Sequence, residues 1–249
     1  MKRMVIGNWK MNLTLPEAMA LAQGSIKAAE KCHGLEIAIA PSHVWLMPIK
    51  DSVRMLPPNF SLVSQAVSQW PEGAYTGDIA AKQLKGLVTY SLVGHSERRQ
   101  YHHENGKVVS EQIKQLLNQG ITPILCFGEM GQATQHTFPP QITIDLRHDL
   151  EGLKPEEIKQ CIFAYEPLWA IGTGNPASPD YVAKAIVHVK NWVSEKYGVH
   201  VRIIYGGSVT EDNAGALGSI RELDGLLVGG ASLQIKRFSQ ICSDFCSIV

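Results

Sequence analysis

Eight short apolar runs, rich in valine, isoleucine and leucine, recur along the whole 249-residue chain. They end near Gly7 (MVIG), Ala40 (LEIAIA), Gln65 (FSLVSQ), Gly94 (YSLVG), Phe127 (ITPILCF), Tyr165 (CIFAY), Tyr205 (VRIIY) and Val228 (GLLV). Within the runs the apolar residues do not alternate with polar ones, as they would in a half-exposed antiparallel strand. Continuous apolar runs are typical of strands that are buried on both faces of a parallel sheet. The pattern therefore predicts eight buried parallel strands.

Helical stretches separate these runs. Thr14–Glu17 (TLPE) has the pattern of a capping box and predicts a helix that runs towards Ala29. Further helices are predicted over Ile79–Leu87, Lys107–Gln119, Asp180–Lys196 and Leu233–Cys246. Alternating strands and helices with right-handed crossovers predict an α/β fold, a single (β/α)8 barrel that forms one domain over residues 1–249. A doubly wound open sheet is the alternative, because one sequence does not give the order of the strands.

The balance of charge restricts the classes of partner. The chain carries 23 lysines and arginines against 23 aspartates and glutamates, and its pI is about 7.1. Proteins that bind nucleic acid or membrane surfaces need a basic face, so neither partner is expected. The first apolar run has no signal-peptide character, and no window approaches the length of a transmembrane helix.

The five cysteines are Cys32, Cys126, Cys161, Cys242 and Cys246, and no two of them form a CxxC pair. Cys242 and Cys246 lie four residues apart in the last predicted helix, a spacing that we attribute to packing rather than to metal binding. No metal site is expected. A reducing cytoplasm is the location that fits this cysteine usage best.

Polar residues and glycines stand directly behind the predicted strands. They are Asn8 and Lys10 after the first strand, Gln65 at the end of the third, His95, Ser96 and Glu97 after the fourth, Glu166 after the sixth, Gly206, Gly207 and Ser208 after the seventh, and Gly229, Gly230 and Ser232 after the eighth. Barrel active sites lie at the carboxyl ends of the strands, and the loops after strands seven and eight often hold phosphate. Groups from six strands would therefore converge on one mouth of the barrel.

Each of these residues also has an ordinary structural explanation. Lys10 could be a solvated surface lysine, His95 a satisfied core histidine and Glu166 a salt-bridged carboxylate, while the paired glycines could be tight turns. Their joint arrangement favours a functional interpretation. Glycine turns that open helices expose N–H groups to anions, and a lysine, a histidine and a glutamate beside them indicate acid–base chemistry on a small phosphorylated substrate.

Five motifs, in the expected order and nearly from end to end of the chain, resemble the triosephosphate isomerase family. They are Gly7–Asn12 (GNWKMN), Val93–Arg99 (VGHSERR), Tyr165–Gly174 (YEPLWAIGTG), Tyr205–Val209 (YGGSV) and Asp224–Leu233 (DGLLVGGASL). The resemblance implies a TIM barrel, and an isomerase of glycolysis and gluconeogenesis. Such an enzyme interconverts dihydroxyacetone phosphate and D-glyceraldehyde 3-phosphate by proton transfer through an enediolate, without a metal or organic cofactor.

The resemblance also implies roles for individual residues. Glu166 would be the base that moves a proton between neighbouring carbons, and neutral His95 would be the electrophile towards the carbonyl and enediolate oxygens. Lys10 would supply fixed positive charge near the substrate, which Asn8 would help to orient. Glu97 lies within the same catalytic motif, with a role less settled than those of the other three catalytic residues.

A phosphate site and a lid follow from the same resemblance. The phosphate would be held by the backbone amides of Gly172, Ser208 and Gly230, with Gly229 beside them. The apolar segment from Pro167 to Ala177 would close over the substrate and exclude water. A helix that begins near Ser96 would direct its positive end at the ring of His95 and so favour the neutral imidazole.

The loop from Gln65 to Gly77 is long for a connection between a strand and a helix. In the family such a loop inserts its tip beside the active-site residues of a second subunit, so the resemblance implies a homodimer formed through this loop. The alternative is a self-packed surface loop, which Trp70 and Tyr75 would also allow.

Three segments depart from the family pattern. Asn175 stands where a lysine usually follows Gly-Thr-Gly. In Ser64–Ala66 (SQA), Ala66 occupies the position where asparagine or aspartate is usual. The segment Gly131–Pro140 (GQATQHTFPP) replaces a charged stretch. The last segment is predicted to be an exposed loop. None of these departures removes a catalytic group.

Two other functions remain open at the level of sequence. A second phosphosugar enzyme, an aldolase, would use Lys10 to form a Schiff base with its substrate. A barrel retained only for binding or as a scaffold would be expected to have lost Lys10, His95 or Glu166, and all three are present.

Overall fold

The structure, a computed structural model, describes residues 2–52, 55–131, 139–170 and 176–246. Its parallel strands close into a barrel in the order of the sequence, with β8 paired to β1. The strands are β1 (Arg3–Asn8), β2 (Leu35–Ala40), β3 (Phe60–Ser64), β4 (Tyr90–Val93), β5 (Thr122–Phe127), β6 (Ile162–Tyr165), β7 (Arg202–Tyr205) and β8 (Gly225–Val228). This closed order confirms the predicted TIM barrel and excludes the open doubly wound sheet.

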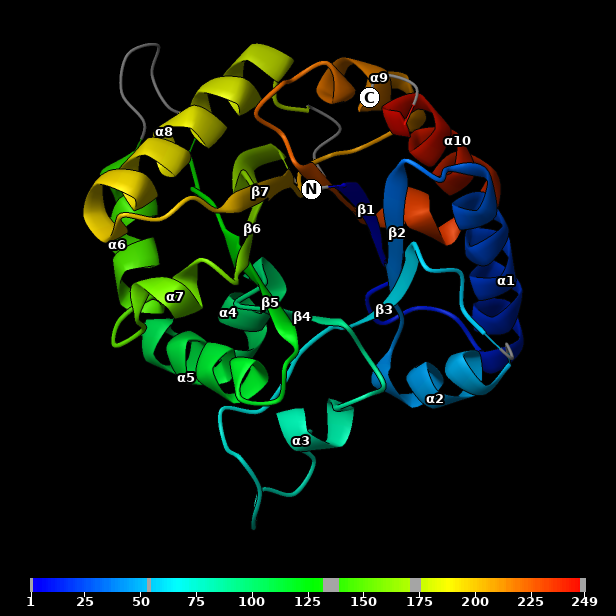
Figure 1. The fold of residues 1–249 in the computed structure, drawn as a ribbon, viewed down its shortest axis with the longest axis horizontal. Helices are drawn as coiled ribbons and strands as arrows, with labels where there is room; N and C mark the ends of the chain where they lie inside the picture. The colour runs from blue at the N-terminus through cyan, green and yellow to red at the C-terminus, as the bar shows by residue number, and fades with distance from the viewer. Residues whose placement is uncertain (1, 53–54, 132–138, 171–175, 247–249) are drawn as a thin grey trace.

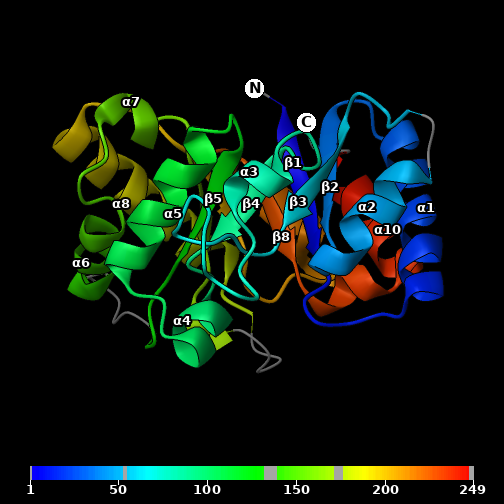
Figure 2. The same ribbon diagram turned by 90° about the horizontal axis from the view of Figure 1, so that it is seen from below.

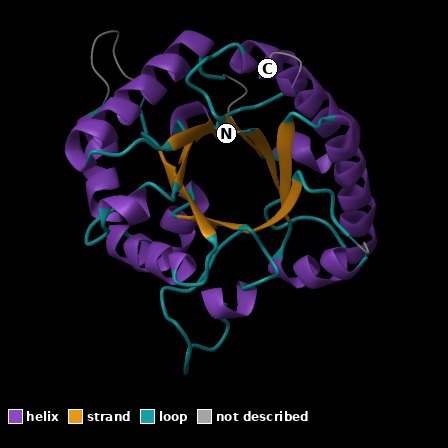
Figure 3. Cartoon of the chain, viewed as in Figure 1, coloured by secondary structure: helices purple, strands orange, loops and turns teal. Residues whose placement is uncertain are grey.

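Helices surround the barrel as an outer ring (Figures 1 and 3). They are α1 (Leu15–Lys31), α2 (His43–Asp51), α3 (Ala81–Leu84), α4 (Ser96–His102), α5 (Gly106–Leu117), α6 (Pro140–Asp149), α7 (Pro155–Ile158), α8 (Pro179–Tyr197), α9 (Glu211–Gly218) and α10 (Ile235–Cys246), with the 3-10 turns η1 (Leu168–Ala170) and η2 (Gly230–Leu233). Among the described residues, no helix combines the length and the apolar character that a membrane span requires.

The consecutive apolar residues of each strand are divided between two cores. In β2, Ala38 and Ala40 belong to the cluster that fills the barrel, together with Ile6 of β1. Their neighbours Ile37 and Ile39 belong to the larger cluster between the strands and the helices. Because side chains alternate between the faces of a strand and both faces are buried here, every position of the strand is apolar.

The helix after β1 begins where its capping pattern predicts. The Thr14 N–H donates a hydrogen bond to Glu17 Oε2 at 2.8 Å, which satisfies one of the free donors at the start of α1. Helices α5 and α8 match their predicted ranges within two residues. Helix α4 begins at Ser96, as the family resemblance implies.

Two predicted helices are shorter than expected. The helix predicted over Ile79–Leu87 is a single turn, α3, which is followed closely by Gly86 with φ +73°. The last helix begins at Ile235 rather than Leu233, because Gln234 is extended (φ −120°, ψ 110°) after the 3-10 turn η2.

Four helices, α2, α6, α7 and α9, were not predicted from the sequence. Helix α2 contains Pro48 in its interior and α9 contains Gly215, two residue types that weaken a helical pattern. Helix α7 has only four residues. Helix α6 begins at Pro140, the last residue of the predicted exposed loop, and residues 132–138 of that loop lie outside the described part of the chain.

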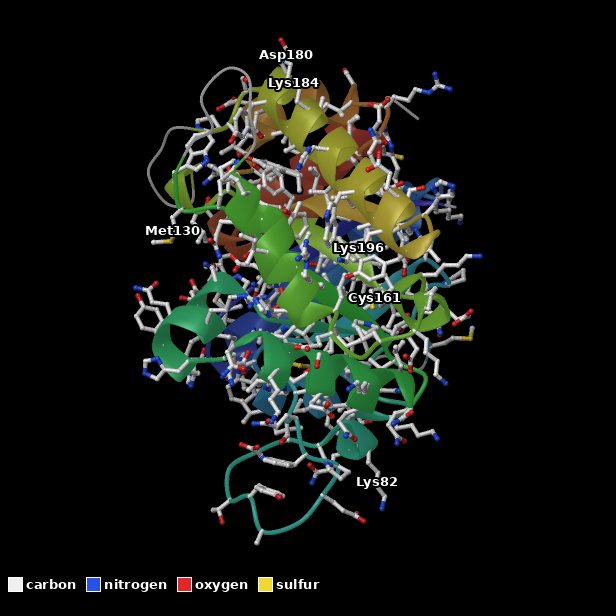
Figure 4. All side chains as sticks on the ribbon, turned by 90° about the vertical axis from the view of Figure 1, so that its left-hand side faces the viewer. Lys82, Met130, Cys161, Asp180, Lys184 and Lys196 are labelled. Atoms are coloured by element: carbon white, nitrogen blue, oxygen red, sulfur yellow. The ribbon has the colours of Figure 1, made fainter. Side chains whose placement is uncertain are left out.

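The carboxyl and amino ends of the strands lie at opposite ends of the barrel, with α4 at the carboxyl end and α7 at the amino end (Figure 2). Figure 4 shows Met130, which follows β5, and Cys161, which precedes β6, towards these opposite ends. The loop between β3 and α3 projects away from the barrel (Figure 1), and Lys82 of α3 forms an ion pair with Glu72 of this loop at 2.9 Å.

Candidate active site

The predicted catalytic residues meet at the carboxyl ends of β1, β4 and β6. Glu166 directly follows β6, and its Oε1 lies 3.4 Å from Nε2 of His95, which directly precedes α4. Lys10 Nζ lies 2.5 Å from Oε1 of Glu97. Asn8, His95 and Glu166 are all buried, whereas Lys10 and Glu97 are partly exposed. The strand ends thus place a carboxylate, an imidazole and an ammonium group in one site.

The Glu166 carboxylate is almost completely shielded from solvent. The residue is 2% exposed, and its backbone N–H donates to the carbonyl of Phe127 at 2.7 Å. Within the described residues no lysine or arginine forms an ion pair with it; the only such contact is that with His95. A buried carboxylate without a cation beside it is costly, which is characteristic of a group kept for chemistry rather than for stability.

Two glycines make room for Glu166. A Cβ atom on Gly128 would lie 1.8 Å from the Glu166 carbonyl oxygen, and one on Gly206 would lie 2.9 Å from Glu166 Cγ. Cys126 lies beneath the carboxylate: burial, and next the charge of Glu166, raise the pKa of the Cys126 thiol well above its usual value. Gly128 and Cys126 were not singled out in the sequence, because their closeness to Glu166 arises only from the pairing of β5 with β6.

The ring of His95 is held in one orientation by α4. Its Nδ1 accepts a hydrogen bond from the Glu97 N–H at 3.2 Å, so the neutral ring carries its proton on Nε2, the nitrogen that faces Glu166. An imidazolium would have an N–H on both nitrogens and would lose this hydrogen bond. The geometry therefore suits a neutral imidazole that donates from Nε2.

Lys10 is positioned through its backbone. It has φ +54°, a left-handed conformation that is uncommon for a residue with a side chain. Its N–H donates to Asn8 Oδ1 at 3.1 Å, and its carbonyl accepts from Gln65 Nε2 at 2.8 Å. The same Gln65 nitrogen also donates to the Ala40 carbonyl at 2.8 Å. Gln65, noted in the sequence only for its place at a strand end, thus fixes the segment that carries the ammonium group.

The glycine turns after β7 and β8 lie beside these residues. A Cβ atom on Gly229 would lie 3.9 Å from Lys10 Cε, whereas one on Gly230, at the start of η2, would meet nothing within 4 Å. Ser232 Oγ donates to the Gly229 carbonyl at 2.7 Å, and Asn213 Nδ2 donates to the Ser208 carbonyl at 2.8 Å. These contacts order the turns predicted to bind phosphate. Gly172, the remaining predicted phosphate ligand, lies outside the described residues.

A buried acid anchors the start of the predicted lid. Glu129 is 2% exposed, and its Oε1 accepts from Tyr165 Oη at 2.9 Å, from Trp169 Nε1 at 2.8 Å and from Tyr181 Oη at 3.0 Å. Burial and the charge of Glu129 raise the pKa of Tyr165 far above its usual value, so that this phenol stays a donor. Glu129 was not predicted from the sequence as a site residue, although its place two residues after β5 was a possible signal. Lid residues 171–175, including Asn175, lie outside the described part of the chain.

The profile of the triosephosphate isomerase family matches residues 3–245. The chain belongs to the triosephosphate isomerase family. A triosephosphate isomerase from Dehalococcoides mccartyi (strain BAV1) is 39% identical over 97% of this chain and 96% of its own, and one from Thermus thermophilus is 40% identical over 94% and 95%. A third, from Clostridium botulinum, is 36% identical over 95% of this chain and 97% of its own. Enzymes of this family are intramolecular isomerases of triose phosphates and are generally dimers.

Proposed function

We propose that Glu166, His95 and Lys10 carry out the reaction of the triosephosphate isomerases, the interconversion of dihydroxyacetone phosphate and D-glyceraldehyde 3-phosphate. The main support is the buried Glu166 carboxylate, 3.4 Å from the His95 ring nitrogen. Moving a proton between neighbouring carbons needs a base with little competing water and a hydrogen-bond donor beside the oxygens. Both are supplied by side chains, and the proposed reaction uses no metal or organic cofactor.

The proton transfer has two steps. Glu166 takes a proton from the carbon beside the carbonyl group, and the electrons of that C–H bond form the enediolate. His95 donates a hydrogen bond from Nε2 to the oxygen on which negative charge develops. The hydroxyl proton of the first carbon passes to the oxygen of the second carbon, beside His95, and the protonated Glu166 returns its proton to the second carbon, which converts the ketose into the aldose.

Lys10 provides positive charge near the developing oxyanion and the phosphate, and Asn8 holds the Lys10 backbone and helps to orient the substrate. Glu97, which pairs with Lys10 at 2.5 Å, has the role of holding the ammonium group in place. The phosphate is assigned to the backbone amides of Ser208 and Gly230, with Gly229 beside them, and to Gly172 of the lid.

The ion pair of Lys10 also bears on the aldolase alternative. A Schiff base requires a free amine, whereas Lys10 Nζ is engaged by the Glu97 carboxylate. Sodium borohydride with dihydroxyacetone phosphate would trap such a Schiff base irreversibly. We expect no loss of activity and no added mass on the peptide that contains Lys10.

A coupled assay of triose phosphate interconversion with Glu166→Gln tests the proposal. General-base catalysis typically contributes about 10²–10⁴-fold, so we expect a loss of kcat in that range. Circular dichroism, Tm and binding of a phosphate analogue should change little. If the variant retains turnover within about tenfold of the wild type, Glu166 is not the base.

We further propose that the dimer forms through the loop from Gln65 to Gly77. Trp70 and Tyr75 of this loop stack with ring centroids 5.0 Å apart, and both remain more than 40% exposed. Beside Lys10 lies a cavity of about 550 Å³ whose lining includes Met11 and Tyr101, which are 95% and 68% exposed. Insertion of the partner's loop tip into this cavity would cover the apolar groups on both sides. Light scattering that finds a stable, active monomer of 27.4 kDa at micromolar concentration would overturn this proposal.

The chain is proposed to work as one catalytic domain over residues 1–249, in the cytoplasm. The closure of β8 on β1 supports a single domain. All five cysteines are free thiols, which is the state expected in a reducing compartment.

A further inference from the structure

Two cysteines from opposite ends of the chain lie together at the outer ring of the barrel. Cys32 is the C-cap of α1, and Cys246 is the last residue of α10. These two helices pack against each other (Figure 1). A Cβ atom built on Gly34, two residues after Cys32, would lie 4.0 Å from Cys246 Sγ. The thiol at the end of the last helix therefore lies close to the segment that leaves the first helix.

The two thiols belong to one packed cluster. Burial raises the pKa of the Cys32 thiol, and the nearby Cys246 thiol raises it further, against an opposing effect of Lys31. Cys32 is 8% exposed, whereas Cys246 is half-buried and more open to solvent. Cys242, one turn before Cys246, is fully buried in the same region.

The position of Cys32 is fixed by its backbone. Its carbonyl accepts from the Leu35 N–H at 3.0 Å and from Asn59 Nδ2 at 3.1 Å, and these residues lie at the amino ends of β2 and β3. On the side of α10, the guanidinium of Arg3, at the start of β1, lies 5.2 Å from the centre of the Phe245 ring. The thiol pair is therefore held on ordered backbone at the amino end of the barrel, opposite the active site.

We propose that Cys32 and Cys246 form a reversible disulfide that joins α1 to α10 when the protein meets low-molecular-weight disulfides. In the resting enzyme both are thiols. The bond would close a loop that includes nearly the whole barrel, and a cross-link over so long a loop restricts the unfolded chain strongly. Its expected effect is to stabilise the barrel without altering the distant active site.

The bond forms by two exchange steps. The thiolate of the more exposed Cys246 attacks one sulfur of the small disulfide, forms a mixed disulfide and releases one small thiolate. The Cys32 thiolate then attacks Cys246 Sγ, which forms the protein disulfide and releases the second small thiolate. The two protons from the cysteines pass to the released thiols. The protein loses two electrons, and the small disulfide gains them.

Oxidised glutathione added to the full-length enzyme tests the proposal. We expect intact mass spectrometry to show the loss of two hydrogen atoms and no bound glutathione, and peptide mapping to join the Cys32 and Cys246 peptides. The oxidised enzyme should unfold at a Tm at least about 5 °C higher, and dithiothreitol should reverse the rise. The value of kcat/KM should stay within about twofold of that of the reduced enzyme.

Cys246→Ser and Cys32→Ser should each abolish the cross-link and the rise in Tm. Cys161→Ser is the matched control, because Cys161 is buried at the same end of the barrel but belongs to a different thiol environment beside Glu157; it should cross-link normally. Cys246 is half-buried, so its serine variant should fold even if Cys32→Ser does not. A lasting glutathione adduct on Cys246, a bond to Cys242 or to a second chain, or no reaction with excess reagent would overturn the proposal.

Discussion

At the amino end of the barrel, several polar side chains have close partners, although Arg202 Nε, at the start of β7, has none among the described residues. Tyr90 Oη donates to Glu36 Oε1 at 2.6 Å, and Lys190 Nζ donates to Asp224 Oδ2 at 2.8 Å. Arg3 donates to the carbonyl of Gly218 at 2.7 Å. Each bond joins segments far apart in the sequence, so this end holds the barrel together in the manner of an ordinary protein core.

At the carboxyl end, several groups lack such compensation. Among the described residues, Glu166 is buried without a lysine or arginine as ion-pair partner, and Glu129 Oε2 has no hydrogen-bond partner. The described residues other than glycine that have positive φ are Lys10, Leu13 and His103, and all three lie in the segments after β1 and β4. Strained backbone and unpaired buried charge both reduce stability.

The difference between the two ends shows how the barrel separates stability from function. Substitutions at the amino end should change the free energy of unfolding and leave turnover intact, whereas substitutions at the carboxyl end should do the reverse. Variants at each end can test this separation, because both activity and Tm can be measured for every one of them.

The largest effect is expected for His95→Gln. The glutamine amide is a neutral donor on a more flexible side chain without the ring whose Nδ1 accepts from the Glu97 N–H, so the developing negative charge is stabilised less well in the transition state. We expect kcat to fall by about 10²–10⁴-fold with little change in KM or Tm. A large rise in KM with kcat preserved would instead assign His95 to binding of the ground state.

The second-largest fall in kcat is expected where a glycine leaves space for Glu166, the proposed base. In Gly206→Ala the new methyl group would lie 2.9 Å from Glu166 Cγ and displace the carboxylate. A shift of about 1 Å in a catalytic group can cost on the order of 100-fold, and we expect kcat to fall by roughly 10- to 100-fold. Gly131→Ala, where an added Cβ meets nothing within 4 Å, is the matched control and should leave kcat unchanged.

The residues changed in these two variants also illustrate which parts of the site could be predicted from the sequence alone. The consecutive apolar runs predicted the strands, because both faces of every strand are buried, and the strand ends predicted Lys10, His95 and Glu166. The contact of Gly128 with Glu166 could not be predicted, since it depends on which strands are neighbours. The three donors that meet Glu129 come from different segments, and no local pattern indicates them. Helix α2 was missed because local propensity at Pro48 is overridden by packing of the helix on the barrel.

The third effect tests how Lys10 is positioned. Gln65→Met retains most of the side-chain volume but removes the two hydrogen bonds to the Lys10 and Ala40 carbonyls. Looser placement of the ammonium group should lower kcat/KM by about tenfold, because stabilisation of a developing charge depends on fixed geometry. This fall in kcat/KM should be larger than the fall in activity caused by unfolded protein, so Tm and activity must be measured on the same preparation. If Tm falls steeply and the activity of the folded fraction is unchanged, Gln65 is purely structural.

The smallest effect on activity, and a clear one on stability, is expected at the amino end for Tyr90→Phe. Burial, the hydrogen bond to Glu36 and the charge of Glu36 raise the pKa of Tyr90 above its ordinary value near 10, against a smaller opposing effect of Arg202. Because the folded protein holds this proton more tightly than the unfolded chain, the stabilising contribution is complete below about pH 10 and is lost as the pH rises further. Tyr205, at the carboxyl end, has its pKa raised to about 12 by burial and loses its contribution between 10 and about 12.

Urea unfolding at about pH 8 and about pH 11 separates these contributions. At the lower pH, Tyr90→Phe should cost about 1–2 kcal/mol, since it removes a hydrogen bond to a carboxylate, while kcat stays within about twofold of the wild type. At the higher pH, the wild type loses the stabilisation that comes from Tyr90, whereas the phenylalanine variant has no such proton to lose. The difference in the free energy of unfolding between the two proteins should therefore shrink. The loss of stability due to Tyr205 should persist in both proteins. A constant difference at both pH values would show that Tyr90 does not titrate with unfolding, and a large drop in kcat would show that the two ends of the barrel are not separate.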